Sequence, residues 1–154
     1  MEQLKKRLEE EHVLVENHPY LKDALLISKY DYLESLETFR EGLFVVQDIS
    51  SMLVGELAHV QAGAQVIDLC AAPGGKALDV AERILMEGQA GCSGHVEARD
   101  LTEYKVSLIE ENIERMGLCN VTAVCQDASV YDEKSAGKAD IVIADLPCSG
   151  LGVL

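Results

Sequence analysis

The sequence predicts an α/β fold with a mainly parallel sheet, preceded by a small α+β segment. From residue 64 onward, short apolar, β-prone runs alternate with longer amphipathic runs. A Gly-rich turn stands between the first of these strands and the helix after it, and Gly117 is placed to end the next helix in a left-handed conformation. Strands that alternate with helices form right-handed crossovers, which make the strands parallel.

The N-terminal segment is expected to span residues 1–45. Residues 1–16 are rich in Glu and Lys and predict a short solvated helix, which ends before Pro19 because a residue that precedes proline avoids helical angles. The apolar runs at residues 24–28 and 42–46 predict two short strands that pair with each other.

The second domain is expected to span residues 46–154. A helix should begin near Asp48 or Ser50, because apolar side chains follow there at helical spacing. Four strands and two further helices should follow. The strands are predicted at residues 65–69, 94–99, 120–125 and 139–145, and the helices at 74–87 and 103–116. The sequence stops soon after the fourth strand, so we expect the sheet to be truncated there and the domain to be incomplete at its C-terminus.

Composition limits the class of protein. The 154 residues suffice for one full domain, and 48% hydrophobic and 26% charged residues are ordinary for a soluble fold. No run approaches the roughly 20 apolar residues of a membrane span, and the N-terminus lacks the apolar core of a secretory signal. The five cysteines are odd in number and form no Cys-x-x-Cys pair. We therefore expect no disulfide framework, no metal site and a reducing cytoplasm.

The net charge of −14 is unusual for a protein that binds nucleic acid, because phosphate contacts draw mainly on Lys and Arg. Charge alone favours a small-molecule or protein partner. If the partner is RNA, we expect the basic surface to lie in flanking regions of a longer protein.

The motif Asp68-Leu-Cys-Ala-Ala-Pro-Gly-Gly-Lys76 follows a predicted strand and opens a helix, where ligands of open α/β sheets bind. Adjacent glycines allow close backbone approach, and the helix start favours an anion or carboxylate. A Walker A loop is excluded because position 70 is Cys and position 77 is Ala, and no Gly-x-Gly-x-x-Gly is present. A nucleoside that carries a carboxylate, such as S-adenosylmethionine, fits best. The alternative is a plain glycine turn.

Acidic residues follow the other predicted strands. Asp100 follows the second strand, Asp127 follows the third, and Asp145 ends the fourth. Each alone is more typical of a surface residue or a helix cap. Together with the glycine loop they place carboxylates around one crevice, and Asp100 stands near the offset at which an acid binds ribose hydroxyls.

The turn Asp145-Leu-Pro-Cys-Ser-Gly150 is the second informative motif. A thiolate that adds to C6 of a pyrimidine activates C5 as a methyl acceptor, which is covalent catalysis. Cys148 stands where such chemistry is expected. The alternative is a small buried hydrophobic residue, which is the usual role of a lone cysteine.

Together with Val46-Gln-Asp-Ile-Ser-Ser51, these two motifs make the sequence resemble the Sun (Fmu, RsmB-type) family of RNA cytosine-5 methyltransferases, from about residue 39 to residue 154. The resemblance implies a Rossmann-like class I methyltransferase fold, the cofactor S-adenosylmethionine, and methyl transfer to C5 of a cytosine in RNA, with 16S rRNA the expected substrate. Residues 1–45 would then be the end of a small RNA-binding domain. From the composition we also expect a cytoplasmic protein without a metal or a membrane, and a monomer.

The resemblance also implies a role for each matched residue. The loop would contact the methionine part of the cofactor, Asp100 the ribose and Asp127 the adenine, while Asp145 would lie at the reacting end. The loop residues concerned are Ala71, Ala72, Pro73, Gly74, Gly75 and Lys76. Cys148 would assist product release, because the family's nucleophile lies in a later Thr-Cys-Ser motif that this sequence does not contain. We therefore expect cofactor binding without turnover. Arg99 departs from the family pattern and is expected to alter the adenine surroundings.

Three other interpretations stay open at this point. In a DNA cytosine-5 methyltransferase the cysteine of the Pro-Cys motif is itself the nucleophile, although the Ala-Ala-Pro-Gly-Gly-Lys loop does not suit that class. A binding module would retain the nucleoside pocket without catalysis. A nicotinamide oxidoreductase is the most distant alternative, because its glycine fingerprint is missing.

Overall fold

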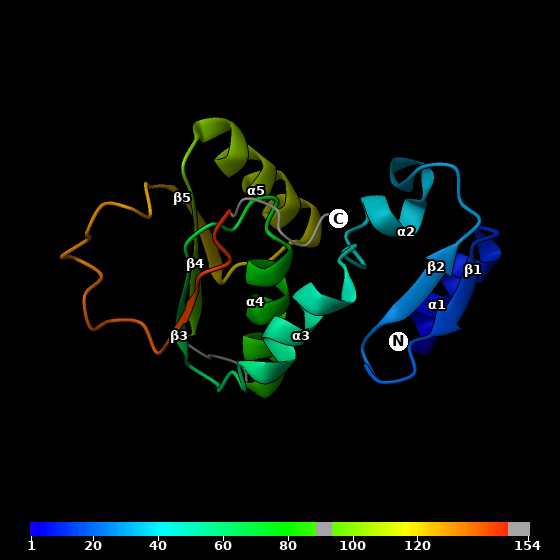
Figure 1. The fold of residues 1–154 in the computed structure, drawn as a ribbon. Helices are drawn as coiled ribbons and strands as arrows, with labels where there is room; N and C mark the ends of the chain where they lie inside the picture. The colour runs from blue at the N-terminus through cyan, green and yellow to red at the C-terminus, as the bar shows by residue number, and fades with distance from the viewer. Residues whose placement is uncertain (89–93, 148–154) are drawn as a thin grey trace, which may run out of the picture. The chain divides into compact units, whose positions relative to one another are not determined.

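The computed structural model describes residues 1–88 and 94–147 (Figure 1). The chain forms two compact units, Met1–Val45 and Val46–Leu154. Each unit has its own cluster of buried apolar side chains.

The first unit combines short helices with a two-stranded antiparallel sheet. Its elements are α1 (Glu2–Glu10), β1 (Leu14–Asn17), β2 (Leu25–Ser28), the 3-10 helix η1 (Leu33–Ser35) and α2 (Glu37–Arg40). The strands pair with Leu14 opposite Ser28 and Asn17 opposite Leu25. Leu8 of α1 packs with Val15 of β1 in the core of this unit.

Two predictions for this unit are wrong. Residues 14–16 belong to a strand instead of the first helix, and β2 pairs with that strand instead of with residues 42–46. Val13 and Val15 are buried while Leu14 between them is exposed, which is the alternation of a strand with one buried face. Residues 42–46 form no strand. They begin at a positive-φ glycine, and the N–H group of Leu43 donates to the carbonyl oxygen of Thr38 in α2.

The second unit contains a parallel four-stranded sheet in the order β5-β4-β3-β6, which confirms the predicted α/β class. Its strands are β3 (Gln65–Asp68), β4 (His95–Asp100), β5 (Val121–Cys125) and β6 (Ile141–Ile143). Val66 lies opposite both Val96 of β4 and Ile141 of β6, so the strands run in register toward a common carboxyl end. The fourth strand is shorter than predicted.

Three helices accompany this sheet: α3 (Ile49–Leu57), α4 (Gly75–Glu87) and α5 (Glu103–Met116). Asp48 caps α3 by accepting from the N–H group of Ser51, and Thr102 caps α5 in the same way. Gly117 ends α5 at φ 65°, as predicted. In Figure 1, α4 and α5 lie on one side of the sheet and residues 126–140, coloured yellow to orange, lie on the other.

The helices bury an apolar interior against that side of the sheet. Leu78, Ile84, Val96 and Ile109 have no measurable exposure. Within residues 1–88 and 94–147, none of the helices combines the length and the apolar character that a bilayer span requires. In the same residues, no group of three or more His, Cys, Asp or Glu side chains is arranged to hold a metal ion.

Candidate functional site

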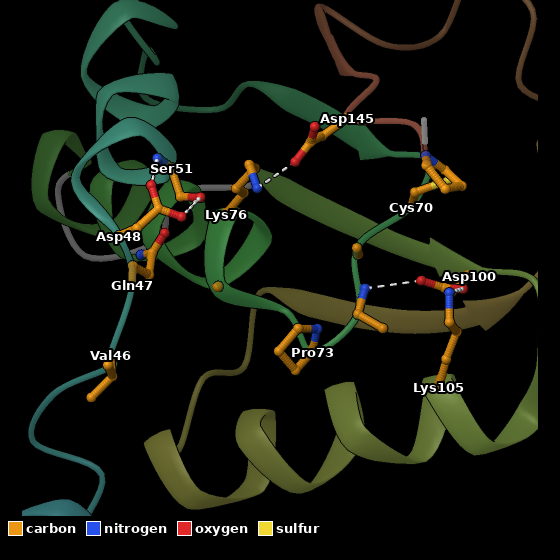
Figure 2. A pocket seen from close by; sticks show the side chains of 14 residues that line it. Val46, Gln47, Asp48, Ser51, Cys70, Pro73, Lys76, Asp100, Lys105 and Asp145 are labelled. Carbon is orange, nitrogen blue, oxygen red and sulfur yellow. Dashed lines mark hydrogen bonds and ion pairs between the residues drawn. The ribbon is translucent and has the colours of Figure 1, made fainter. Parts of the chain in front are cut away.

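A cavity of about 390 Å³ opens at the carboxyl end of the parallel sheet in the second unit (Figure 2). Its wall comes from the strand ends and from the starts of the helices that accompany them. The lining residues are Val46, Gln47, Asp48, Ser51, Cys70, Ala71, Ala72, Pro73, Gly75, Lys76, Asp100, Lys105, Asp145 and Pro147. The two sequence motifs and the start of α3 therefore meet at one place.

The glycine loop is held in place by backbone hydrogen bonds. The N–H group of Ala71 donates to the carbonyl oxygen of Arg99 at 2.8 Å, which ties the loop to β4. Gly74 has φ 109°, a conformation that residues with a side chain rarely adopt, and its N–H group donates back to Ala71. Gly75 then begins α4, so the unpaired N–H groups of that helix start lie at the cavity.

Asp100, at the end of β4, is the most buried acid among the lining residues. Its carboxylate is 2% exposed and accepts from the N–H groups of Ala72 at 3.0 Å and Leu101 at 2.7 Å, while the ammonium of Lys105 lies 3.1 Å away. Burial alone would raise the pKa of Asp100, but these hydrogen bonds lower it below its usual value. Asp100 is therefore a fixed carboxylate beside the glycine loop.

Lys76 and Asp145 form an ion pair across the cavity. The Lys76 Nζ lies 2.6 Å from a carboxylate oxygen of Asp145, and Figure 2 shows the two side chains reaching toward each other. Lys76 comes from the first turn of α4, while Asp145 follows β6. This pair connects the glycine loop to the start of the Pro-Cys motif.

Asp68, at the end of β3, does not line the cavity, but its carboxylate accepts from the N–H group of Cys70, which does. Asp68 is 1% exposed, and its Oδ2 has no hydrogen-bond partner among the described residues. Burial raises the pKa of Asp68 to about 6, aided by the charges of Asp145 and Asp100 and opposed by Lys76 and the N–H group of Cys70. An acid in such surroundings gains or loses its proton close to neutral pH.

Cys70 is the described cysteine that lines the cavity. Burial and the nearby charges of Asp100 and Asp68 raise the pKa of its thiol. A thiol with a raised pKa stays protonated at neutral pH, and the thiolate is the reactive form. Cys70 is therefore not suited to act as a nucleophile.

The start of α3 supplies side chains that the sequence did not mark as site residues. Asp48 accepts from the hydroxyl and N–H groups of Ser51, and from the hydroxyl of Ser50, and these bonds lower the pKa of Asp48 to about 2. Gln47 lies beside Asp48 on the cavity wall. The motif at residues 46–51 could have marked Gln47 and Asp48 as site residues. It contributed to the family resemblance, but no role was predicted for any single residue in it. Lys105 belongs to no motif, so in the sequence it cannot be distinguished from any other lysine on a helix surface.

The predicted site residues divide into three groups. Most of the glycine loop, Asp100 and Asp145 line the cavity, whereas Gly74 and Asp127 are not among its lining residues. Asp127 is exposed, and its carboxylate accepts from the N–H and hydroxyl groups of Ser129. Cys148 lies outside the described residues.

Arg99, which was expected to alter the adenine surroundings, does not line the cavity either. Its guanidinium is buried and contacts Glu97, Asp132 and Ser135. Arg99 and Asp100 are successive residues of a strand, and successive side chains point to opposite faces of a sheet. The structure thus gives Arg99 a bonding role away from the candidate site.

Comparison with known proteins identifies relatives of this chain. The family model of the 16S rRNA methyltransferase RsmB/F matches residues 56–154. A probable ribosomal RNA small subunit methyltransferase B of Bacillus subtilis is 36% identical over 145 residues, which are 94% of this chain and 31% of that protein. The chain thus spans about a third of the length of this curated relative.

Solved structures agree with this match. The crystal structure of PH0851 superposes with a TM-score of 0.85 at 28% identity, over 96% of this chain and 32% of that one. NSun6 from Pyrococcus horikoshii, solved with SFG, superposes with a TM-score of 0.65 at 29% identity, over 81% of this chain and 32% of that one. The second unit therefore has the Rossmann-like methyltransferase fold, as the family resemblance implied.

Proposed function

Because the chain belongs to the 16S rRNA methyltransferase RsmB/F family, we propose that it binds S-adenosylmethionine in the cavity at the carboxyl end of its sheet. We propose further that the whole protein transfers the methyl group to C5 of a cytosine in ribosomal RNA. The observation that carries the proposal is the fixed Asp100 carboxylate beside the glycine loop and the free start of α4.

The two halves of the cofactor call for different partners. Its methionine carboxylate suits the unpaired N–H groups at Gly75 and Lys76, where the helix dipole favours negative charge. Its ribose hydroxyls are donors and suit Asp100, which accepts from Ala72, Leu101 and Lys105 and has lone pairs left for a ligand.

Asp127 is proposed to contact the adenine from the exit of β5. It stands two residues beyond that strand, and the N–H group of the intervening Gln126 donates to the carbonyl oxygen of Asp100. The exit of β5 therefore runs beside the ribose acid. An exposed carboxylate at this place can accept from the exocyclic amine of a purine.

The Lys76–Asp145 pair is proposed to face the reacting end. When bound, the cofactor supplies an electrophilic methyl group on a sulfonium centre. Asp145 and Lys76 provide an acceptor and a donor that can orient a polar base beside that methyl group. Cys148 follows three residues later and is proposed to assist product release. The 154 residues contain no Thr-Cys-Ser motif from which the attacking thiolate would come.

The remaining parts of the proposal concern the whole protein. The first unit is proposed to be the end of a small RNA-binding domain, and the site of action to be the cytoplasm. The charge of −14 belongs to a chain that spans 31% of its relative. We propose that the basic surface for RNA lies in the parts of the protein outside these residues.

Two experiments test the proposal. The purified 154-residue chain, titrated with S-adenosylmethionine in a calorimeter, is expected to bind it at one site and to form no 5-methylcytosine when 16S rRNA is added. Absence of binding, or formation of 5-methylcytosine by this chain, would contradict the proposal.

The second experiment uses the whole protein and RNA that contains 5-azacytosine, which traps the covalent adduct. Cys148→Ala is expected to leave adduct formation intact, because the attacking thiolate is proposed to lie elsewhere. Loss of the adduct in that variant would instead assign the nucleophile to Cys148, as in DNA cytosine-5 methyltransferases.

A further inference from the structure

Gln47 brings an unpaired hydrogen-bond acceptor to the wall of the cavity. The residue lines the cavity directly before the N-cap of α3, and its Oε1 is buried without a hydrogen-bond partner among the described residues. A buried amide oxygen that accepts nothing destabilises a fold, and such groups are rare without a reason. A bound ligand that donates to this oxygen would supply the reason.

The place of Gln47 limits which part of a ligand it can meet. Its side chain packs on Gly75, the first residue of α4, so closely that a Cβ atom at that position would lie 3.2 Å from Cγ of Gln47 and 3.4 Å from its Oε1. The unpaired acceptor therefore lies beside the unpaired N–H donors of the helix start. A ligand group at this point meets donors and an acceptor together.

The other polar side chains of the wall already have partners. Asp48 accepts from Ser50 and Ser51, and Asp145 is paired with Lys76. Asp100 accepts from two backbone N–H groups and lies against Lys105. Among the buried side-chain nitrogen and oxygen atoms that the described lining residues bring to the cavity, Gln47 Oε1 is the one without a hydrogen-bond partner.

An α-amino acid carries a carboxylate and an ammonium group on one carbon, which matches donors and an acceptor side by side. We propose that Gln47 Oε1 accepts a hydrogen bond from the α-ammonium group of the cofactor's methionine moiety, whose carboxylate lies at the start of α4. This inference rests on the proposed cofactor site. It makes Gln47 the residue that distinguishes an amino-acid-bearing nucleoside from one that lacks the ammonium group.

Calorimetric titration of the 154-residue chain tests the inference. The probes are S-adenosylhomocysteine and its desamino analogue, which keeps the carboxylate and lacks only the α-ammonium. In Gln47→Met the affinity for S-adenosylhomocysteine is expected to fall about tenfold, because a hydrogen bond to a charged group is lost. The affinity for the desamino analogue is expected to stay within about twofold of the unmodified chain.

Two further variants complete the experiment. Gln61→Met removes an exposed glutamine at the opposite end of the sheet and is expected to change neither affinity. Gln47→Glu keeps an acceptor of nearly the same shape and is expected to retain S-adenosylhomocysteine binding within about threefold. Thermal unfolding of each variant records whether it is folded.

Each remaining outcome has a distinct meaning. If Gln47→Met lowers the affinity for both probes equally, Gln47 acts by packing on Gly75 and the inference is overturned. If it lowers neither, the acceptor is not used and the inference is likewise overturned. If the unmodified chain binds neither probe, the proposed cofactor site itself is wrong, and the inference fails with it.

Discussion

The interior of the second unit, between its helices and its sheet, is built from apolar residues, whereas the carboxyl end of the sheet contains buried acids. The interior is apolar and closed, with Leu78, Ile84 and Ile109 fully buried against the sheet. At the carboxyl end, Asp68 and Asp100 are nearly as buried, but they are acids. Each oxygen of the Asp100 carboxylate accepts a backbone hydrogen bond, whereas Asp68 Oδ2 accepts none from the described residues.

This difference separates what stabilises the fold from what suits it to a ligand. Apolar burial contributes roughly 25 cal/mol per Å², so the interior supplies stability. Burial of an unpaired polar group costs about 1 to 3 kcal/mol, so Asp68 Oδ2 and Gln47 Oε1 at the carboxyl end lower stability. Variants in the two regions should therefore change stability and ligand affinity independently of each other.

The largest expected effect lies in the interior. Ile84→Ala should lower the free energy of unfolding by about 4 kcal/mol, because it leaves a cavity beneath β4 that the surroundings cannot fill. The same variant should leave the affinity for S-adenosylhomocysteine unchanged at temperatures where it is folded. Urea denaturation and calorimetric titration measure the two quantities. A loss of stability below about 1 kcal/mol would show that the interior is loosely packed.

The next effect has the opposite sign and depends on pH. The pKa of Asp68 is raised to about 6 in the folded chain, from a usual value of 3.8, so between these values the folded state binds more protons than the unfolded state. Asp68 therefore makes stability fall as pH rises from about 4 to about 6, and the loss persists above that range.

Asp68→Asn should remove this dependence and raise the free energy of unfolding at pH 7.5 by up to about 3 kcal/mol, since one pKa unit corresponds to about 1.4 kcal/mol. Urea denaturation of both forms at pH 4.5 and 7.5 measures the difference. Equal slopes with pH in the two forms would contradict the ionisation assigned to Asp68.

At the site itself the expected change is in affinity. Asp100→Asn keeps the size of the side chain but puts an amide donor where the carboxylate accepts from Ala72 and Leu101. The affinity for S-adenosylhomocysteine should fall about thirtyfold, which corresponds to about 2 kcal/mol. Unchanged affinity in this variant would remove Asp100 from the proposed ribose site.

The smallest expected effect belongs to Asp127, which is exposed and already accepts from Ser129. Asp127→Asn should lower the affinity for S-adenosylhomocysteine about threefold, because an exposed hydrogen bond contributes little. If Asp127→Asn lowered the affinity as much as Asp100→Asn, Asp127 would contribute as much to cofactor binding as Asp100, which would contradict this prediction. Both variants can be titrated under the same conditions.

The elements of the second unit could be predicted from the sequence, whereas the strand pairing of the first unit could not. In the second unit the signals are local: Asp48 precedes its helix, Gly117 ends another, and each strand is followed by a turn and a helix. Parallel pairing then follows from the connections. In the first unit, apolar runs at three places could pair, and the choice of β1 for β2 depends on packing around Leu8 and Val15 that no local pattern records.

Asp100 and Lys76, where motif and strand end coincide, were predicted as site residues, and both line the cavity. Their roles toward a ligand stay predictions. Other lining residues were missed because their place depends on contacts that form only in the folded chain. Gln47 packs on Gly75 only after folding. Lys105 at the start of α5 reaches Asp100 at the end of β4, a contact that no motif marks. Arg99 was expected to alter the adenine surroundings because it departs from the family pattern, but the alternation of side chains along β4 puts it among Glu97, Asp132 and Ser135.

The carboxyl end of this sheet is proposed to bind S-adenosylmethionine. Calorimetric titration of the 154-residue chain with S-adenosylhomocysteine, and separately with NADH, tests it most directly. Saturable binding of S-adenosylhomocysteine at one site, weakened by Asp100→Asn and not matched by NADH, is the predicted result. No saturable binding, binding that Asp100→Asn leaves unchanged, or equal binding of NADH would contradict the claim.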